Sequence, residues 1–384
     1  MAPKRSHVLN PLVVPAADPA RVLDELEAAI AGEASLLPVP DNDEARARRL
    51  VDSQLAGRPI DPEVAVVVAT SGSTGPPKGA ELTAANLVSS ADATHRRLGG
   101  PGQWLLAMPA HHIAGLQVLV RSLVAGVEPY CLNLSSGFSI EEFARGAAEL
   151  DRTGDRSYTA LTPMQLAKAL DELAGIDALR TFDAVLVGGG PLDESLRSAC
   201  ERLGINAVAT YGSAETSGGL VYDGRPLSGA RVRVERGSGR IVVGGPMVAR
   251  GYRNRDSNAF PEPGWFRTSD AGRLDEDGVL HVEGRIDQVI STGGLKLHPE
   301  VLERALRAIP GVAEAAVAGV PDPRFGQAVV AAYEGTAAAE DVYAGLEDLP
   351  RWQLPKQLRR VESLPRAALG KVDRGAVARL FSTP

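Results

Sequence analysis

The sequence predicts an α/β protein with a large N-terminal domain and a small C-terminal α+β domain. Three observations lead to this prediction. Strand-like runs alternate with helical stretches up to about Thr210, which is typical of a largely parallel sheet. From about Gly229, short strand-like pieces are separated by glycine turns, and this texture predicts an antiparallel or barrel-like β region. After Gly284 helical and strand-like segments resume, and the remaining chain is long enough for a small domain.

The composition excludes several classes of protein. The chain has 384 residues, 44% hydrophobic and 23% charged, which is ordinary for a soluble globular protein. Its formal net charge of -7 argues against a general nucleic-acid-binding role. The two cysteines, Cys131 and Cys200, lie far apart without a pairing or metal-binding pattern, which fits a reducing compartment. No apolar run approaches the roughly 18 residues of a membrane span. Pro11 and Pro15 interrupt the N-terminal apolar stretch, which argues against a signal peptide. We therefore expect a cytoplasmic protein.

The first third of the chain carries helix caps and one strong strand signal. Asp18 followed by Pro19 predicts a helix through about Ala31, and Asp41 to Asp43 predict the cap of another through about Leu55. The run VAVVVA at 64–69 is typical of a strand buried on both faces. It is followed by TSGSTGPPKG at 70–79, and Thr83 then predicts the cap of a further helix.

The later segments repeat this arrangement and then depart from it. FDAVLV at 182–187 leads into a glycine turn at 188–190, and the strand-like segment 207–210 leads into Tyr211 and Gly212. Beyond the antiparallel region, helical spacing appears over 301–309, and strands are expected at 312–320 and 328–333. We expect a large domain at 1–284, a hinge at 285–287 and a small domain at 288–384.

The segment 70–79 has the composition of a phosphate-binding loop. It combines three glycines, four hydroxyl side chains and Lys78 after a buried strand. Glycines let the backbone N–H groups approach an anion, and the lysine supplies positive charge. The loop is not a Walker A motif, because Pro77 and Gly79 occupy positions that require glycine and a hydroxyl residue. The glycines at 188–190 are weak by themselves, since Asp193 stands where a dinucleotide fingerprint has its third glycine.

The loop resembles the phosphate loop of the adenylate-forming superfamily, which contains acyl- and aryl-CoA ligases, peptide-synthetase adenylation domains and luciferases. Five further segments resemble motifs of that superfamily, in the order in which it carries them: GGGPL at 188–192, YGSAET at 211–216, WFRTSD at 265–270, GRIDQVI at 284–290 and PRAALGKVDR at 365–374. Six ordered motifs over roughly 300 residues are far more specific than any one of them.

The resemblance implies an acid–thiol ligase that uses ATP, Mg²⁺ and coenzyme A and releases AMP and pyrophosphate. It makes Glu215 the carboxylate linked to Mg²⁺, Lys371 the catalytic lysine of a mobile C-terminal domain, and Asp287 the hinge. His112 becomes a catalytic and substrate-side residue, with Ser217 and Gly218 against the acid. The resemblance assigns ATP binding to Thr70, Ser71, Gly72, Ser73, Thr74, Gly75, Lys78, Gly189, Gly190, Tyr211, Gly212, Thr216, Asp270 and Arg285.

Within the superfamily the chain most resembles short o-succinylbenzoate–CoA ligases of menaquinone (vitamin K2) biosynthesis. HHIAGL at 111–116 is similar to a histidine-containing motif of that group, and only about 60 residues precede the phosphate loop. Two positions depart from the superfamily pattern, since Ala214 replaces the usual threonine and Ser269 the usual glycine.

Several alternatives stay open at this point. The chain is alternatively another aryl- or fatty-acid–CoA ligase, or a stand-alone adenylation enzyme that loads a carrier protein. A non-catalytic nucleotide-binding relative is a third interpretation, which the presence of Lys78, Glu215, Asp270 and Lys371 argues against. The expected partners are a small carboxylic acid, ATP and coenzyme A, without nucleic acid or a membrane span, and the sequence leaves a homodimer open.

Overall fold

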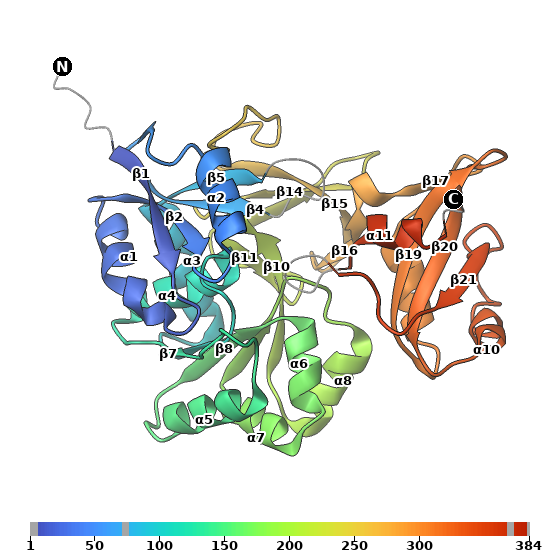
Figure 1. Ribbon diagram of the computed structural model, residues 1–384, viewed down its shortest axis with the longest axis horizontal. Coiled ribbons are helices and arrows are strands. Elements are labelled where there is room, and N and C mark those ends of the chain that lie inside the picture. The colour runs from blue at the N-terminus through green and yellow to red at the C-terminus, as the bar shows by residue number, and fades with distance from the viewer. Residues whose placement is uncertain (1–6, 71–76, 367–371, 382–384) are drawn as a thin grey trace. The chain divides into compact units, whose positions relative to one another are not determined.

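The computed structural model describes residues 7–70, 77–366 and 372–381 (Figure 1). Their elements divide between two compact units of unequal size. The first unit comprises the described residues of Met1–Arg233 and Val242–Arg267, and the second those of Val234–Ile241 and Thr268–Pro384. The mixed α/β class with a large N-terminal and a small C-terminal part is confirmed. Residues 268–284, assigned to the large domain above, belong to the second compact unit, and the hinge at 285–287 stays a prediction.

The first unit begins with a five-stranded sheet in the order β3-β1-β2-β4-β5. Strand β1 pairs in parallel with β2, and β2 with β4, whereas β5 runs antiparallel to β4. The first five residues of β4 are buried, as its β-branched sequence predicts. The strands are β1 (His7–Val14), β2 (Ser35–Pro40), β3 (Pro59–Ile60), β4 (Val64–Thr70) and β5 (Lys78–Thr83).

The helices around this sheet begin where the sequence predicts caps, with one difference. Thr83 accepts from the amide of Asn86, whose side chain accepts from Thr83 in return, and Asp43 accepts from the amide of Arg46. The segment after Asp18 starts as a 3-10 turn at Pro19–Val22, and Asp18 makes no side-chain cap hydrogen bond. The helices are α1 (Leu23–Ile30), α2 (Glu44–Ser53) and α3 (Ala84–Leu98).

The first unit also contains a seven-stranded sheet in the order β12-β11-β10-β9-β8-β6-β7. Its strands from β7 to β10 are parallel, and β11 and β12 continue it antiparallel, so the predicted parallel α/β sheet is confirmed. Its strands are β6 (Gln103–Leu106), β7 (Tyr130–Cys131), β8 (Ser157–Leu161), β9 (Ala184–Val187), β10 (Ala207–Ser213), β11 (Gly218–Tyr222) and β12 (Arg225–Pro226).

Two groups of helices accompany this sheet. Helices α3 and α4 pack together, and α5, α6 and α7 form a second group with α8 nearby, at the bottom of the view in Figure 1. The apolar side chains of the second group close over Val185 and Val187 of β9. The helices are α4 (Ile113–Ala125), α5 (Ile140–Asp151), α6 (Pro163–Leu170), α7 (Leu173–Thr181) and α8 (Glu194–Leu203).

The predicted antiparallel region is a meander of four strands in sequence order. Strands β15 and β16 pair antiparallel, with a register shift between Ala271 and Gly272. A Cβ at Gly272 would lie 2.5 Å from the carbonyl oxygen of His281, so the close approach of the two strands here requires glycine. The strands are β13 (Arg231–Val234), β14 (Arg240–Gly244), β15 (Trp265–Leu274) and β16 (Leu280–Arg285).

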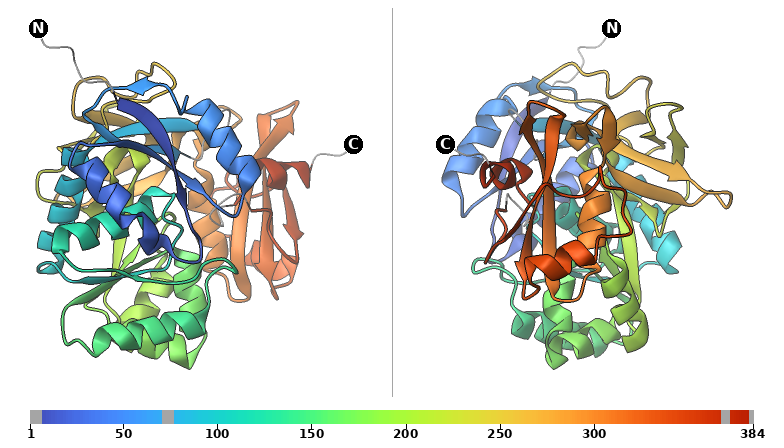
Figure 2. Two further views of the ribbon diagram at one scale, coloured as in Figure 1. Left: turned by 60° about the vertical axis from the view of Figure 1, so that its left-hand side comes forward. Right: turned by 90° about the vertical axis from the view of Figure 1, so that its right-hand side faces the viewer.

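The second unit is built on the long antiparallel hairpin of β19 and β20. Alternate residues of the hairpin point to opposite faces, so Val317 packs into an apolar cluster with α9 and Ala316 into another with α11. Figure 2 (right) shows this unit toward the viewer. Its elements are β17 (Ile290–Thr292), β18 (Leu295–Leu297), α9 (Pro299–Arg307), β19 (Val312–Asp322), β20 (Gly326–Gly335), α10 (Ala339–Ala344), β21 (Gln357–Arg360) and α11 (Arg374–Arg379).

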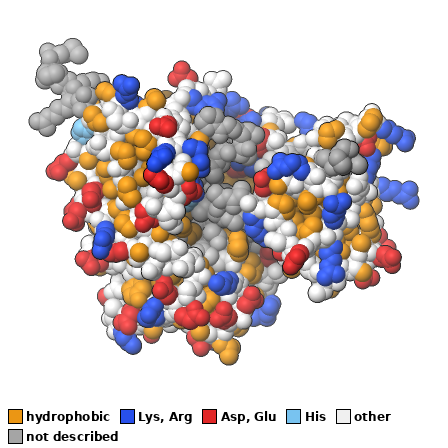
Figure 3. Space-filling model, viewed as in Figure 1, with side chains coloured by type: hydrophobic (Ala, Val, Ile, Leu, Met, Phe, Trp, Pro, Cys, Tyr) orange, Lys and Arg blue, Asp and Glu red, His pale blue; other side chains and the backbone are white. Residues whose placement is uncertain are grey.

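The distribution of charged side chains and the character of the helices are those expected from the composition. Acidic and basic side chains are interspersed over the face that Figure 3 shows, rather than separated into regions of one sign. Among the described residues, no helix combines the length and the apolar character that a membrane crossing requires.

A buried histidine makes the stability of the first unit depend on pH. The ring of His95 is 5% exposed, and its Nε2 accepts a hydrogen bond of 3.2 Å from Nε1 of Trp104. Burial lowers the pKa of His95 to about 4, and the charge of Arg121 acts in the same direction. An unfolded histidine has a pKa of about 6.5. The unfolded state therefore binds more protons between these two values, and stability rises with pH across that window.

We expect the free energy of unfolding to fall by about 1–2 kcal/mol for His95 alone when the pH drops from about 7 to about 5. The contribution is fully present above a pH of about 6.5 and is lost as the pH falls toward about 4. Urea unfolding over this range checks the slope, and His95→Gln should flatten it because glutamine does not titrate. An identical slope in both proteins would remove His95 as its source.

Candidate functional site

The predicted phosphate loop joins two antiparallel strands. Thr70 ends β4 and pairs with Lys78, the first residue of β5. The helix capped by Thr83 is confirmed, but the sequence analysis did not predict the strand before it, on which Ala80 and Leu82 are buried. The predicted ligands Ser71, Gly72, Ser73, Thr74 and Gly75 lie outside the described residues.

Tyr252 connects the predicted phosphate lysine to the predicted metal carboxylate. Nζ of Lys78 lies 5.2 Å from the centroid of the Tyr252 ring, and the Tyr252 hydroxyl donates to Oε1 of Glu215 at 2.7 Å. Backbone pairing with Ala80 and an edge-to-face contact with Phe260 hold the ring. Burial, and then the charge of Glu215, raise the pKa of Tyr252, so the hydroxyl stays a donor. The sequence analysis missed this residue, although its aromatic ring directly after Gly251 was a signal.

Glu215 has the surroundings of a ligand for a hard cation. It lies in a short 3-10 turn at Ala214–Thr216 and is 7% exposed. Among the described residues, its carboxylate accepts one hydrogen bond, from Tyr252, which leaves lone pairs free. Among the described residues, no group of three or more acidic, histidine or cysteine side chains is placed to hold a metal ion. One carboxylate together with phosphate oxygens and water suits Mg²⁺.

The residues around Glu215 form a tight turn between β10 and β11. A Cβ at Gly212 would lie 2.0 Å from the carbonyl oxygen of Gly218, so only glycine fits this approach. The hydroxyl of Thr216 donates to the same carbonyl oxygen at 2.7 Å, and Ser217 Oγ donates to the carbonyl of Met247 at 2.9 Å. Both predicted hydroxyls are therefore engaged by the backbone. Ala214 is buried within the turn.

The predicted adenine-side residues are neighbours at one edge of the parallel sheet. Val187 of β9 is in register with Ala209 of β10, so the glycine turn after β9 lies beside Tyr211. Gly189 has a φ of +80° and open space at its Cβ position. A Cβ at Gly190 would lie 3.5 Å from Cγ of Pro163. Carboxyl ends of parallel strands are the usual place for a ligand in such sheets.

Three predicted residues of the second unit form one cluster. Asp270 and Arg285 are register partners on β15 and β16, and Nη1 of Arg285 lies 3.9 Å from Oδ1 of Asp270. Nε of Arg285 donates to Oδ1 of Asp287 at 2.8 Å. This hydrogen bond is the largest of the effects that raise the pKa of Arg285. The structure thus brings the predicted ribose ligands and the predicted hinge residue together.

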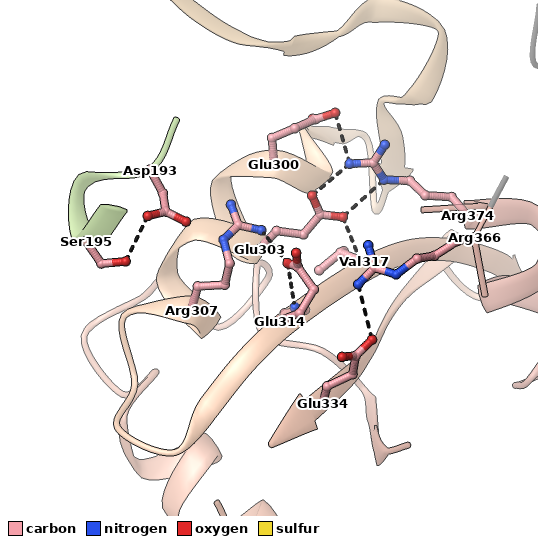
Figure 4. A network of polar contacts seen from close by, with 11 residues as sticks. Asp193, Ser195, Glu300, Glu303, Arg307, Glu314, Val317, Glu334, Arg366 and Arg374 are labelled. Atoms are coloured by element: carbon pink, nitrogen blue, oxygen red, sulfur yellow. Dashed lines mark hydrogen bonds and ion pairs between the residues drawn. The ribbon is translucent and has the colours of Figure 1, made fainter. Parts of the chain in front are cut away.

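Lys371 lies outside the described residues, and the contacts of Arg366, Val372 and Arg374 are described. Arg366 and Val372 pair with each other as an antiparallel β-bridge. Arg374 donates to the buried Glu303 at 2.7 Å and lies 3.1 Å from Glu300, as Figure 4 shows. Glu303 in turn accepts from the backbone amide of Val317. The start of α11 is therefore fixed to α9 and β19.

His112 is the N-cap residue of helix α4 and contacts Arg46. Nη2 of Arg46 donates to Nε2 of His112 at 3.1 Å, and the rings of His111 and His112 lie 4.3 Å apart. Burial lowers the pKa of His111 to about 4 and also lowers that of Arg46. The side chain of Gln117, one turn further along α4, lies against Gly218, so the start of α4 adjoins the turn that carries Glu215.

The chain matches two family models. The model for AMP-binding enzymes matches residues 12–253, and the model for the C-terminal domain of AMP-binding enzymes matches residues 301–371.

Curated relatives and solved structures agree with these matches. The chain is 48% identical over 373 residues to a probable 2-succinylbenzoate–CoA ligase of Mycobacterium tuberculosis, with 94% of this chain and 96% of that protein covered. It is 32% identical over 345 residues to a 2-succinylbenzoate–CoA ligase of Enterococcus faecalis, with 82% and 69% covered.

Two structures of o-succinylbenzoate CoA synthetase from Bacillus subtilis share the fold. The complex with its acyl-adenylate intermediate gives a TM-score of 0.84 at 23% identity, with 99% of this chain and 89% of that chain covered. The complex with ATP and magnesium gives a TM-score of 0.72 at 26% identity, with 92% of this chain and 81% of that chain covered.

Proposed function

The chain belongs to the family of AMP-binding enzymes, and on that premise we propose that it is an ATP-dependent ligase that converts o-succinylbenzoate to its CoA thioester in menaquinone biosynthesis. The sequence identity of 48% to the mycobacterial ligase, over nearly the full length of both chains, carries this proposal. The contacts among Lys78, Tyr252 and Glu215 support it, because one tyrosine has a cation over its ring and a carboxylate at its hydroxyl.

The reaction has two steps. A carboxylate oxygen of the acid attacks the α-phosphorus of ATP, and the bond to the β-phosphate oxygen breaks, so that pyrophosphate leaves and an acyl-adenylate remains. The sulfur of coenzyme A then attacks the acyl carbon, loses its proton, and displaces AMP. The site must screen the phosphate charges and hold the acid in line.

The side chains of this chain have separate tasks in the first step. Lys78 and Thr70, with the loop residues Ser71 to Gly75, hold the β- and γ-phosphates. Mg²⁺, when bound to Glu215 and the phosphates, neutralises the charge that develops on the leaving group. Gly189, Gly190, Tyr211 and Gly212 border the adenine. Asp270 accepts from the ribose hydroxyls, and Arg285 lies beside it. Lys371 reaches the α-phosphate and the attacking carboxylate when the C-terminal domain turns about Asp287.

Tyr252→Phe should weaken the magnesium dependence of the first step. The change removes the hydroxyl bonded to Glu215 and keeps the ring beneath Lys78. A hydrogen bond to a charged group contributes about 1.5–3 kcal/mol, so we expect a roughly 10- to 100-fold loss of kcat/KM for ATP and a higher Mg²⁺ requirement. Pyrophosphate release measured against Mg²⁺ concentration checks this.

A matched control loses a phenolic hydroxyl elsewhere. Tyr343 in the second unit donates to the carbonyl of Pro355, so Tyr343→Phe makes the same chemical change. It should leave the magnesium dependence at the wild-type value. If both variants behaved alike, Tyr252 would have no part in orienting Glu215.

A panel of acids tests the proposed function. With ATP and coenzyme A, o-succinylbenzoate should yield thioester far faster than benzoate or fatty acids. If a fatty acid reacted fastest, the assignment of o-succinylbenzoate as the substrate would be wrong, and the assignment to the acid–CoA ligases would stand. Transfer to a phosphopantetheinylated carrier protein in preference to coenzyme A would favour the stand-alone adenylation enzyme. If no acid led to release of pyrophosphate, the protein would be a non-catalytic nucleotide-binding relative.

The location and the assembly belong to the same proposal. Cys131 and Cys200 are free thiols and Cys200 is buried, which fits the reducing environment of the cytoplasm. A homodimer is the assembly we propose, and sedimentation of the purified protein tests it.

A further inference from the structure

Arg46 is a cation whose side-chain partner is a histidine. It lies on α2, is half-buried, and donates to Nε2 of His112 at 3.1 Å. No carboxylate of the described residues lies within ion-pair distance of its guanidinium. Asp43, the nearest acidic residue along the helix, accepts with Oδ1 from the backbone amide of Arg46 instead. A guanidinium has five N–H donors, so one contact to His112 leaves the others available to an anion.

The neighbourhood of Arg46 favours an anion as its missing partner. His112 is the N-cap residue of α4, a helix of 13 residues. Its side chain makes no capping hydrogen bond to the helix N-terminus. The partial positive charge of a helix N-terminus adds to that of Arg46. Nε2 of His111 is buried and has no hydrogen-bond partner among the described residues. Burial lowers the pKa of His111 to about 4, so it stays neutral at pH 7 and can donate one N–H without adding charge.

A fully buried amide continues this polar cluster toward Glu215. Gln117 is 0% exposed, and its Oε1 has no partner in the part of the chain that the structure describes. Its Cγ lies 3.4 Å from the position that a Cβ on Gly218 would occupy. Ile113, the first residue of α4, lies 4.0 Å from the same position, so the first turns of α4 border the turn after Glu215. An acid held near that turn would therefore extend along the start of α4 toward Arg46.

The proposed substrate carries an anionic group that could bind to this cluster. o-Succinylbenzoate carries two carboxylates, of which one is adenylated and the other stays ionised. We propose that Arg46, together with His112, binds the carboxylate that is not adenylated, and so selects a dicarboxylic aromatic acid. A planar guanidinium matches a carboxylate with two parallel hydrogen bonds. This inference rests on the proposed function.

The experiment compares o-succinylbenzoate with two analogues that each lack one carboxylate, 4-oxo-4-phenylbutanoate and 2-butanoylbenzoate. The analogue that the wild-type enzyme adenylates serves as the monoacid probe. Arg46→Gln should lower kcat/KM for o-succinylbenzoate about 30- to 100-fold, mainly through KM, because the lost contact holds the substrate in both ground and transition state. The kcat/KM for the monoacid and the KM for ATP should stay within about twofold of wild type.

Two further variants separate binding from structure. Arg46→Lys keeps the positive charge but not the two parallel donors of the guanidinium. It should lower kcat/KM for the diacid less than Arg46→Gln does. Arg48→Gln, on the same helix, removes an exposed arginine paired with Glu44 and should change neither acid. Equal losses for diacid and monoacid in Arg46→Gln, or no loss for either, would overturn the inference. Failure of o-succinylbenzoate with the wild-type enzyme would instead overturn the proposed function.

Discussion

Replacement of Lys371 by alanine should slow acyl-adenylate formation by about 10²–10³-fold, which is the usual loss when one preorganised donor to a developing charge is removed. The resemblance of PRAALGKVDR to the C-terminal motif of adenylate-forming enzymes motivates this prediction. The lysine would neutralise charge on the α-phosphate and orient the attacking carboxylate, and neither water nor alanine replaces it. Rapid-quench measurement of the first half-reaction gives the rate.

The second half-reaction separates two interpretations of this lysine. We propose that the C-terminal domain turns away before coenzyme A attacks, so Lys371→Ala supplied with preformed acyl-adenylate should make thioester at nearly the wild-type rate. Lys356→Ala, which removes an exposed lysine paired with Asp322 in the same unit, is the matched control and should slow neither step. If Lys371→Ala slowed both steps equally, the lysine would act in one fixed site and domain alternation would have to be abandoned.

Glu215→Gln should have the second-largest effect, a loss of about 10²–10³-fold in pyrophosphate release at a fixed Mg²⁺ concentration. The substitution keeps the size of the side chain and removes its charge. A neutral amide is a poorer ligand for Mg²⁺ than a carboxylate, and it still has an oxygen to accept from Tyr252. Higher Mg²⁺ should recover part of the activity, and a magnesium titration of the first half-reaction measures this recovery.

Glu81 provides the control for Glu215. It is half-buried on β5 of the same unit, and burial raises its pKa. Glu81→Gln therefore makes the same chemical change at a residue to which we assign no phosphate or metal contact. Its magnesium dependence should match that of the wild-type enzyme. A Glu215→Gln variant with an unchanged magnesium dependence would show that another group holds the metal.

Several parts of the fold and the site were determined by the sequence alone, because each depends on residues that are close along the chain. The run VAVVVA became the buried strand β4, and Asp43 and Thr83 cap the helices that they precede. Caps and strand patterns act through contacts over a few residues, so they can be recognised before the fold is known. The six ordered motifs likewise identify the family without any structure.

Other elements required the tertiary structure. Strand β1 contains Pro11, and β2 contains Pro38 and Pro40, so local propensity argues against both. They form because Leu9 and Leu37 are completely buried in the sheet core, and this gain from burial depends on partners elsewhere in the chain. Strand β5 escaped prediction for the same reason, since its six residues are stabilised by pairing with β4 and by the burial of Ala80 and Leu82.

The functional contacts show most clearly where the information in the sequence ends. Glu215 could be assigned from its motif, but Tyr252, which donates to it, lies 37 residues further along the chain. Arg46 and His112 are 66 residues apart and meet only because the fold of the first unit brings their side chains together. A motif specifies which residue type the chemistry requires. The partner that orients it is decided by packing between distant segments, since many sequence positions are equally able to supply a hydroxyl or a guanidinium.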